Sequence, residues 1–194
     1  MICDTNALIF LSMKAARIKK GGGIFSLESM DSRVSAAHEK VSGYRQKGIP
    51  VRITGTVIEE SGNRKIWMII DRKCGFLNYD QKRLLINQII SRRNEIFSKL
   101  APHYEISLGQ IKGAYDSILS FYTSPETKGM LEKIQERKES KYLLPSPNDM
   151  NLLAECIHIK ESENKRVILL TDDSHFTEFS QEIRERFGIE IESL

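Results

Sequence analysis

The 194-residue sequence predicts an α/β fold in which a parallel sheet is flanked by helices. A short apolar run at residues 1–4 leads into a helical pattern from Asn6 to Met13. Near the other end, residues 166–170 form a continuous apolar run, and a helical pattern that closes at Gly188 follows. Such continuous runs are typical of buried parallel strands. Alternation of strand and helix at both ends favours a parallel sheet with right-handed crossovers.

The composition is that of an ordinary globular protein, with 40% apolar and 28% charged residues. No apolar stretch approaches the roughly 18 residues needed to span a bilayer, and the first ten residues lack the features of a signal peptide. Cys3, Cys74 and Cys156 show no paired spacing, which argues against a zinc site or a disulfide framework. We therefore expect a cytoplasmic protein with reduced thiols and no membrane partner.

Charge is distributed unevenly along the chain. Residues 1–100 carry 18 Lys and Arg against 9 Asp and Glu, whereas residues 101–194 carry 11 against 17. A basic half is compatible with a polyanionic partner such as a nucleic acid, and equally compatible with ordinary solvated helices.

The basic half contains a predicted break, a helix and a second strand. Gly21-Gly22-Gly23 predicts a flexible break in regular structure. Lys19 and Lys20 precede it, close in sequence to Asp4, where they can reach phosphates. A helix capped by Asp31 or Ser32 is expected to run to about Lys47. Residues 49–54 then form a predicted strand, and Glu59 and Glu60 follow it.

The middle of the chain is predicted to be a helical insertion. Residues 79–142 have helical character throughout, with stripes that begin at Leu84 and at Ile111. We expect a single domain over residues 1–194, with its core at about 1–75 and 143–194 and the elaboration at about 76–142. After the insertion, Ser146, Pro147 and Asp149 match a helix N-cap, N1 and N3 in a capping box.

Acidic residues fall at corresponding places in these predicted elements. Asp4 follows the first strand, Glu59 or Glu60 the second, and Asp172 or Asp173 the strand at 167–170, while Asp149 opens a helix. Each has a local explanation as a helix cap or a first-turn acid. Together they predict a carboxylate cluster at the carboxyl edge of the sheet, where Mg²⁺ or Mn²⁺ would offset the repulsion.

Four segments resemble the PIN-domain nucleases, a family of Mg²⁺- or Mn²⁺-dependent ribonucleases that includes the VapC-type toxins. The opening Ile2-Cys3-Asp4-Thr5-Asn6-Ala7-Leu8-Ile9 and the closing Leu169-Leu170-Thr171-Asp172-Asp173-Ser174-His175-Phe176 carry the resemblance. The segment Val57-Ile58-Glu59-Glu60 and Asp149 add to it. Ser61 stands where many members have Leu, and His175 stands where a further acid is often found. The resemblance covers about residues 1–75 and 143–194.

The resemblance implies a PIN-like sheet and an endoribonuclease that acts on single-stranded RNA. Its catalytic and metal-binding residues would be Asp4, Glu60, Asp149 and Asp173, with Glu59 as an alternative ligand. Asn6, Thr171 and Asp172 would support these carboxylates, and Lys19 and Lys20 would bind the RNA backbone. The resemblance also implies a homodimer and a protein antitoxin or regulator as partners.

Two other functions compete with this hypothesis. A haloacid-dehalogenase-like phosphatase also opens with an Asp at a strand end, but it needs a second acid two residues later, where this chain has Asn6. The other alternative is a catalytically weak PIN-like scaffold that binds RNA or protein. Binding of Mn²⁺ distinguishes the scaffold from the nuclease, because a ligand of the native state raises the melting temperature.

Overall fold

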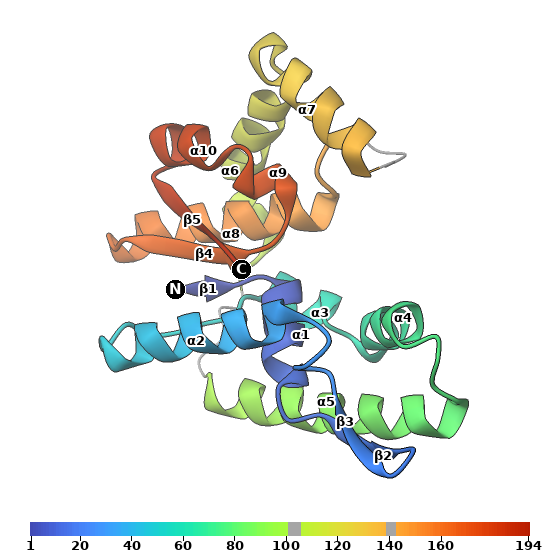
Figure 1. The fold of residues 1–194 in the computed structure, drawn as a ribbon. Coiled ribbons are helices and arrows are strands. Elements are labelled where there is room, and N and C mark those ends of the chain that lie inside the picture. The colour runs from blue at the N-terminus through green and yellow to red at the C-terminus, as the bar shows by residue number, and fades with distance from the viewer. Residues whose placement is uncertain (101–105, 139–142) are drawn as a thin grey trace. The chain divides into compact units, whose positions relative to one another are not determined.

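The computed structural model describes residues 1–100, 106–138 and 143–194 (Figure 1), and their backbone contacts separate into two units. Unit 1 contains Met1–Ile2, Thr54–Thr56 and the described residues from 106 to 193. Unit 2 contains Cys3–Ile53, residues 57–100 and Leu194. The parts of the predicted helical insertion at 101–105 and 139–142 lie outside the described residues.

The fold is α/β, mostly helical, with a small parallel sheet in the order β1-β4-β5. Val167 to Thr171 of β4 align in register with Ile189 to Ser193 of β5. Every residue of β4 is buried, which agrees with its continuous apolar sequence. The strands are β1 (Ile2–Cys3), β4 (Val167–Thr171) and β5 (Ile189–Ser193).

The helices of unit 1 pack around β4, β5 and a cluster of aromatic side chains. Phe121 makes edge-to-face contacts with Tyr122, Phe179 and Phe187 at centroid distances of 4.9–5.7 Å. Such contacts add to the free energy gained from burying the rings. These helices are α6 (Leu108–Tyr122), α7 (Pro125–Lys138), α8 (Pro147–Glu163), α9 (Ser174–Thr177) and α10 (Ser180–Phe187).

Unit 2 is built around α1, a helix buried on almost every side and contacted by α2 and α5. Asp31 caps α2 and also binds Arg33 and Lys73, and the hydrogen bonds from these cations hold the pKa of Asp31 well below its usual range. The elements assigned to this unit are α1 (Thr5–Met13), β2 (Arg17–Lys20), β3 (Gly23–Ser26), α2 (Ser32–Gln46), α4 (Asn63–Lys73) and α5 (Tyr79–Lys99), with α3 (Gly55–Glu60) starting at its boundary.

The glycine run belongs to a β-hairpin: regular structure breaks at Gly21 and Gly22 as predicted, whereas Gly23 already belongs to β3. β2 and β3 pair antiparallel, with Lys20 opposite Gly23. Gly21 and Gly22 have φ of 56° and 84°. A two-residue turn with both φ values positive matches the twist of a hairpin, and glycine adopts it at no steric cost.

Two predictions for the basic half are wrong. Residues 49–54 do not form a strand: Val51 and Ile53 are buried, but pairing is limited to isolated bridges. Pro50 has no N–H to donate, and alternating burial alone does not supply a partner. Glu59 and Glu60 therefore follow no strand and lie in the last turn of α3. On α5, Leu84 is 56% exposed and does not belong to the buried stripe.

All three cysteines are free and buried. Burial, and after it the negative charge of Asp4, raises the pKa of the Cys3 thiol to about 12. Burial raises the pKa of the Cys156 thiol as well. Both thiols therefore stay protonated at neutral pH.

Gly188 ends α10 in the left-handed conformation, with φ of 68°. A Cβ built there would lie 2.6 Å from Nζ of Lys160, which donates a 3.0 Å hydrogen bond to the Phe187 carbonyl. We expect Gly188→Ala to lower the free energy of unfolding by about 1–2 kcal/mol through backbone strain, with a further loss from Lys160. Urea denaturation measures this change.

Gly43→Ala is the matched control, because Gly43 lies inside α2 and a Cβ there meets nothing within 4 Å. Its expected effect is a gain of up to about 1 kcal/mol from helix propensity. A Gly188→Ala variant as stable as the wild type would contradict the assigned cap.

Candidate functional site

Asp4 stands at the N-terminus of α1 and caps it. Its backbone is extended, and its Oδ1 accepts a 2.6 Å hydrogen bond from the N–H of Ala7. The residue is only 5% exposed. The carboxylate is thus fixed at the end of the helix where N–H groups and the helix dipole favour negative charge.

Glu60 reaches the same end of α1. The Thr5 hydroxyl donates a 2.6 Å hydrogen bond to Oε2 of Glu60, and Lys65 Nζ lies 3.3 Å from Oε1. Because Thr5 directly follows Asp4, a second carboxylate is held beside the first turn of α1. Glu59 is exposed, and the described contacts with α1 are made by Glu60.

A buried cation holds the residue that follows Glu60 in the sequence. This cation was not among the site residues predicted from the sequence. Arg93 of α5 is 9% exposed and donates a 2.6 Å hydrogen bond to the carbonyl of Ser61. Ser61 is fully buried, and its hydroxyl donates to the carbonyl of Ile58. A cation at the C-terminus of α3 also complements the helix dipole. The small Ser61 side chain therefore belongs to the anchor that orients Glu60.

In unit 1, Asp149 occupies N3 of α8 and completes the capping box predicted from the sequence. The Ser146 hydroxyl accepts from the N–H of Asp149 at 3.2 Å, while Oδ2 of Asp149 accepts from the N–H of Ser146 at 3.0 Å. The side chain is half-buried. The box explains why Asp149 lies where it does, and its carboxylate keeps lone pairs beyond those of the cap.

Asp173 caps the short helix α9 at the end of β4. Its Oδ1 accepts from the N–H of His175 at 2.8 Å and lies 3.1 Å from Nδ1 of the same residue. The hydroxyl of Thr171, fully buried, accepts from the N–H of Asp173 at 3.0 Å. Thr171 therefore orients the Asp173 backbone, while Asp172 beside it is half-buried.

The two acids of unit 1 both affect the phenol of a buried tyrosine, Tyr122. The Tyr122 hydroxyl donates a 2.6 Å hydrogen bond to the carbonyl of His175. Burial raises the pKa of the Tyr122 phenol well above its usual range, and the negative charges of Asp173 and Asp149 raise it further. Both carboxylates thus act on one phenol. Sequence analysis missed Tyr122 because its place on an apolar helical stripe indicates only packing.

His175 has one ring nitrogen in use and one without a partner. Nδ1 faces Asp173, whereas Nε2 is buried and has no hydrogen-bond partner among the described residues. If Nδ1–H donates to the carboxylate, Nε2 carries the free lone pair. His175 therefore contacts the same Asp173 oxygen, Oδ1, with both its backbone N–H and its ring.

Of the other residues predicted for this site, Asn6 lies in the turn that Asp4 caps, whereas Lys19 and Lys20 lie elsewhere in unit 2. Asn6 is half-buried in the first turn of α1. Lys19 and Lys20 are exposed on the hairpin, which follows the other end of α1 (Figure 1). Nine helical residues at 1.5 Å each put about 14 Å between the two ends of α1. Closeness of Lys19 to Asp4 in sequence is therefore not closeness in space.

The four predicted ligands are divided between the units, with Asp4 and Glu60 in unit 2 and Asp149 and Asp173 in unit 1. Within the described part of the chain, no group of three or more His, Cys, Asp or Glu side chains is arranged to hold a metal ion.

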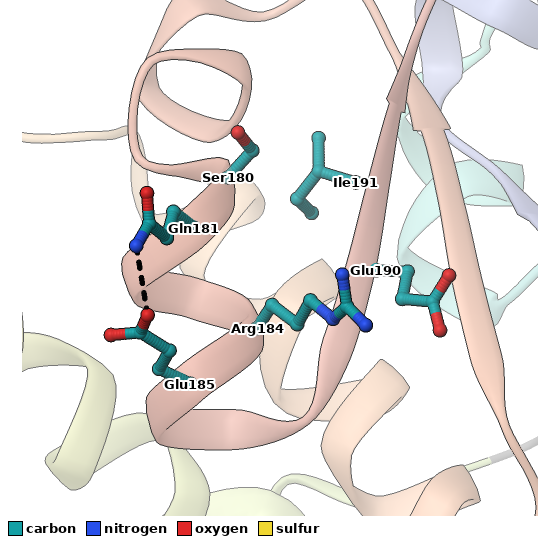
Figure 2. Close-up of a pocket in the computed structure, with 6 residues that line it drawn as sticks. All are labelled: Ser180, Gln181, Arg184, Glu185, Glu190 and Ile191. Carbon is teal, nitrogen blue, oxygen red and sulfur yellow. Dashed lines mark hydrogen bonds between the residues drawn. The ribbon is translucent and has the colours of Figure 1, made fainter.

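A cavity of about 640 Å³ lies between α10 and β5, away from the predicted residues (Figure 2). Gln181 donates to Glu185 at 2.9 Å, and the pKa of Glu190 is lowered mainly by its hydrogen bond with Arg166, with a smaller contribution from the charge of Arg184. Arg184 extends from α10 toward β5 in Figure 2. The lining residues are Ser180, Gln181, Arg184, Glu185, Glu190 and Ile191.

Comparison with known proteins gave no match to a family model, to a curated protein or to a solved structure. A search of the described helices found none with the length and apolar character to cross a membrane.

The buried hydroxyl of Tyr122 can be tested by its removal. Tyr122→Phe leaves the His175 carbonyl without this donor, so we expect the free energy of unfolding to fall by about 1–3 kcal/mol. Tyr115→Phe on the same helix is the control, since Tyr115 is only half-buried, and it should change stability by less than about 0.5 kcal/mol. Equal effects of the two substitutions in urea denaturation would contradict the role given to Tyr122.

Proposed function

We propose that this chain is a divalent-metal-dependent ribonuclease that binds Mg²⁺ or Mn²⁺, directly or through water, with the carboxylates of Asp4 and Glu60 in unit 2 and those of Asp149 and Asp173 in unit 1. The observation that carries the proposal is the hydrogen bond from Thr5 to Glu60, which brings a second carboxylate to the helix end occupied by the buried Asp4. Burial and a neighbouring negative charge both disfavour the ionised form of a carboxyl group. A bound cation offsets both unfavourable effects.

The donor set suits hard cations. All four proposed ligands offer carboxylate oxygens, which Mg²⁺ and Mn²⁺ prefer. The side chains of Glu60 and Asp173 are 24% and 23% exposed, so solvent and substrate reach them. A bound ion lowers the pKa of a coordinated water and neutralises charge on a phosphodiester.

The chain's own residues orient these carboxylates. Thr5 donates to Glu60, and Arg93 fixes the end of α3 that carries it. Thr171 and His175 fix Asp173 from its backbone and from its side chain. Asn6 and Asp172 lie next to the acids in sequence and supply further polar groups. Such surrounding contacts set the orientation of metal ligands.

A catalytically inactive PIN-like scaffold is the second candidate, and one observation favours it. Each of the four carboxylates accepts a hydrogen bond from a backbone N–H at the start of a helix or from a neighbouring hydroxyl. Caps stabilise helices without any function. In that case the acids would be purely structural, and the chain would bind RNA or a protein without cleaving RNA.

The substitution Asp4→Asn separates the two candidates, because Asn caps a helix about as well as Asp. We expect Asp4→Asn to reduce Mn²⁺-dependent cleavage of single-stranded RNA by at least about 100-fold while the variant stays folded. Asp31→Asn is the matched control, since Asp31 caps α2 in the same unit and is no proposed ligand. Cleavage by Asp4→Asn at the wild-type rate would contradict the proposal.

Metal binding is checked separately by thermal unfolding in a Mn²⁺ titration. The nuclease predicts that millimolar Mn²⁺ raises the melting temperature of the wild type and of Asp31→Asn, but not of Asp4→Asn. No shift in the wild type, together with no cleavage, would support the scaffold. Turnover of a small phosphomonoester would instead revive the phosphatase hypothesis.

A further inference from the structure

The β2–β3 hairpin of unit 2 is a fixed element that presents cations to solvent. Ile18 points inward at 6% exposure, whereas Arg17, Lys19 and Lys20 are exposed. The backbone of Arg17 is clamped by one side chain of α5: its N–H donates to Gln88 Oε1 at 2.8 Å, and its carbonyl accepts from Gln88 Nε2 at 2.9 Å. The tight two-glycine turn and this clamp hold the hairpin against α5.

No acid compensates this positive charge locally. Residues 14–27 contain four Lys and Arg and no Asp or Glu. Among the described residues, none forms an ion pair with Arg17, Lys19 or Lys20, although ion pairs are frequent elsewhere in unit 2.

An exposed aromatic ring stands beside these cations. Phe76, in the loop between α4 and α5, is 52% exposed. Lys20 Nζ lies 4.1 Å from the centroid of its ring, and Phe25 of β3 contacts it edge-to-face at 5.5 Å. Two neighbours thus fix the ring while about half of its surface stays open to solvent.

Other exposed aromatic and apolar side chains of unit 2 lie on α5 and β3. Tyr79 is 65% exposed and stacks on Trp67 at 5.8 Å, with an angle of 27° between the rings. Leu84, 56% exposed, precedes Gln88 by one helical turn and therefore lies on the side of α5 that faces β2. Ile24 adds a further apolar side chain, 73% exposed, on β3.

We propose that this surface, formed by the β2–β3 hairpin and Phe76, binds single-stranded RNA away from the carboxylates. Unpaired cations track a phosphate backbone, and fixed, exposed aromatic rings stack with unpaired bases. In a duplex the bases are stacked on one another and cannot stack on Phe76. The Phe76 ring therefore favours binding of a single strand. The positive charge matches RNA, whereas an apolar protein partner would leave it uncompensated.

The inference rests on the proposed function only in identifying the bound RNA as the substrate. Because α1 separates the hairpin from Asp4 by about 14 Å of helix, the surface acts as a second contact for a longer strand. Substitutions there should raise KM for long RNA and leave kcat unchanged.

The test measures binding of a labelled single-stranded RNA to the full chain by fluorescence anisotropy in EDTA, where metal-dependent cleavage cannot occur. Phe76→Leu keeps an apolar side chain and removes the ring, and we expect it to weaken binding about 5- to 100-fold. The double variant Lys19→Gln/Lys20→Gln should weaken binding and reduce the salt dependence by about 1.4 in the slope of log K against log salt concentration. Thermal unfolding checks that both variants are folded.

Lys47→Gln is the control, since Lys47 is an exposed lysine of the same unit that also lies near an aromatic ring, 5.7 Å from the Tyr44 centroid. It should bind as the wild type does. Wild-type affinity in Phe76→Leu, equal affinity of the wild type for duplex RNA, or self-association through this surface in place of RNA binding would each overturn the inference.

The outcomes also separate this inference from the proposed function. RNA binding that depends on Phe76, in a wild type that never cleaves, would contradict the nuclease and support the surface. Metal-dependent cleavage of long RNA with an unchanged KM in Phe76→Leu would support the nuclease and contradict the surface.

Discussion

The N–H groups at the start of each helix need acceptors, and this chain repeatedly supplies an aspartate. Asp4, Asp31 and Asp173 cap α1, α2 and α9, and Asp149 completes the box on α8. A cap fixes both the backbone and the carboxylate, so each helix start also becomes a rigidly placed negative group. The candidate chemistry and the stability of the helices therefore depend on the same oxygens.

The acids differ in what else they contact. Asp31 binds two cations, and its charge is neutralised within unit 2. Asp4 instead has a second carboxylate brought toward it through Thr5, and Asp173 has a histidine whose other nitrogen has no hydrogen-bond partner among the described residues. A helix cap alone requires neither contact. These additions distinguish Asp4 and Asp173 from an aspartate that only caps.

Local features of the fold were predictable from the sequence, and features that depend on distant partners were not. The capping box of Ser146 and Asp149 needs only four consecutive residues, and the apolar run of β4 predicts its own burial. Residues 49–54 alternate like a strand, yet pairing depends on a neighbour that the pattern does not contain. The contact of Glu60 with Thr5 spans 55 positions, so the sequence could favour Glu60 over the alternative Glu59 without showing what Glu60 contacts. Tyr122 and Arg93 were missed because their partners are carbonyl groups, which every residue has.

The buried thiol of Cys3 has a consequence for experiments on the segment that carries Asp4. Alkylating reagents and oxidants react with the thiolate, and in the native state this thiol is both enclosed and protonated. Modification of Cys3 then requires transient opening of the start of the chain, and its rate measures how often that opening occurs. The cysteine next to Asp4 is thus a natural reporter of local unfolding at the first candidate ligand.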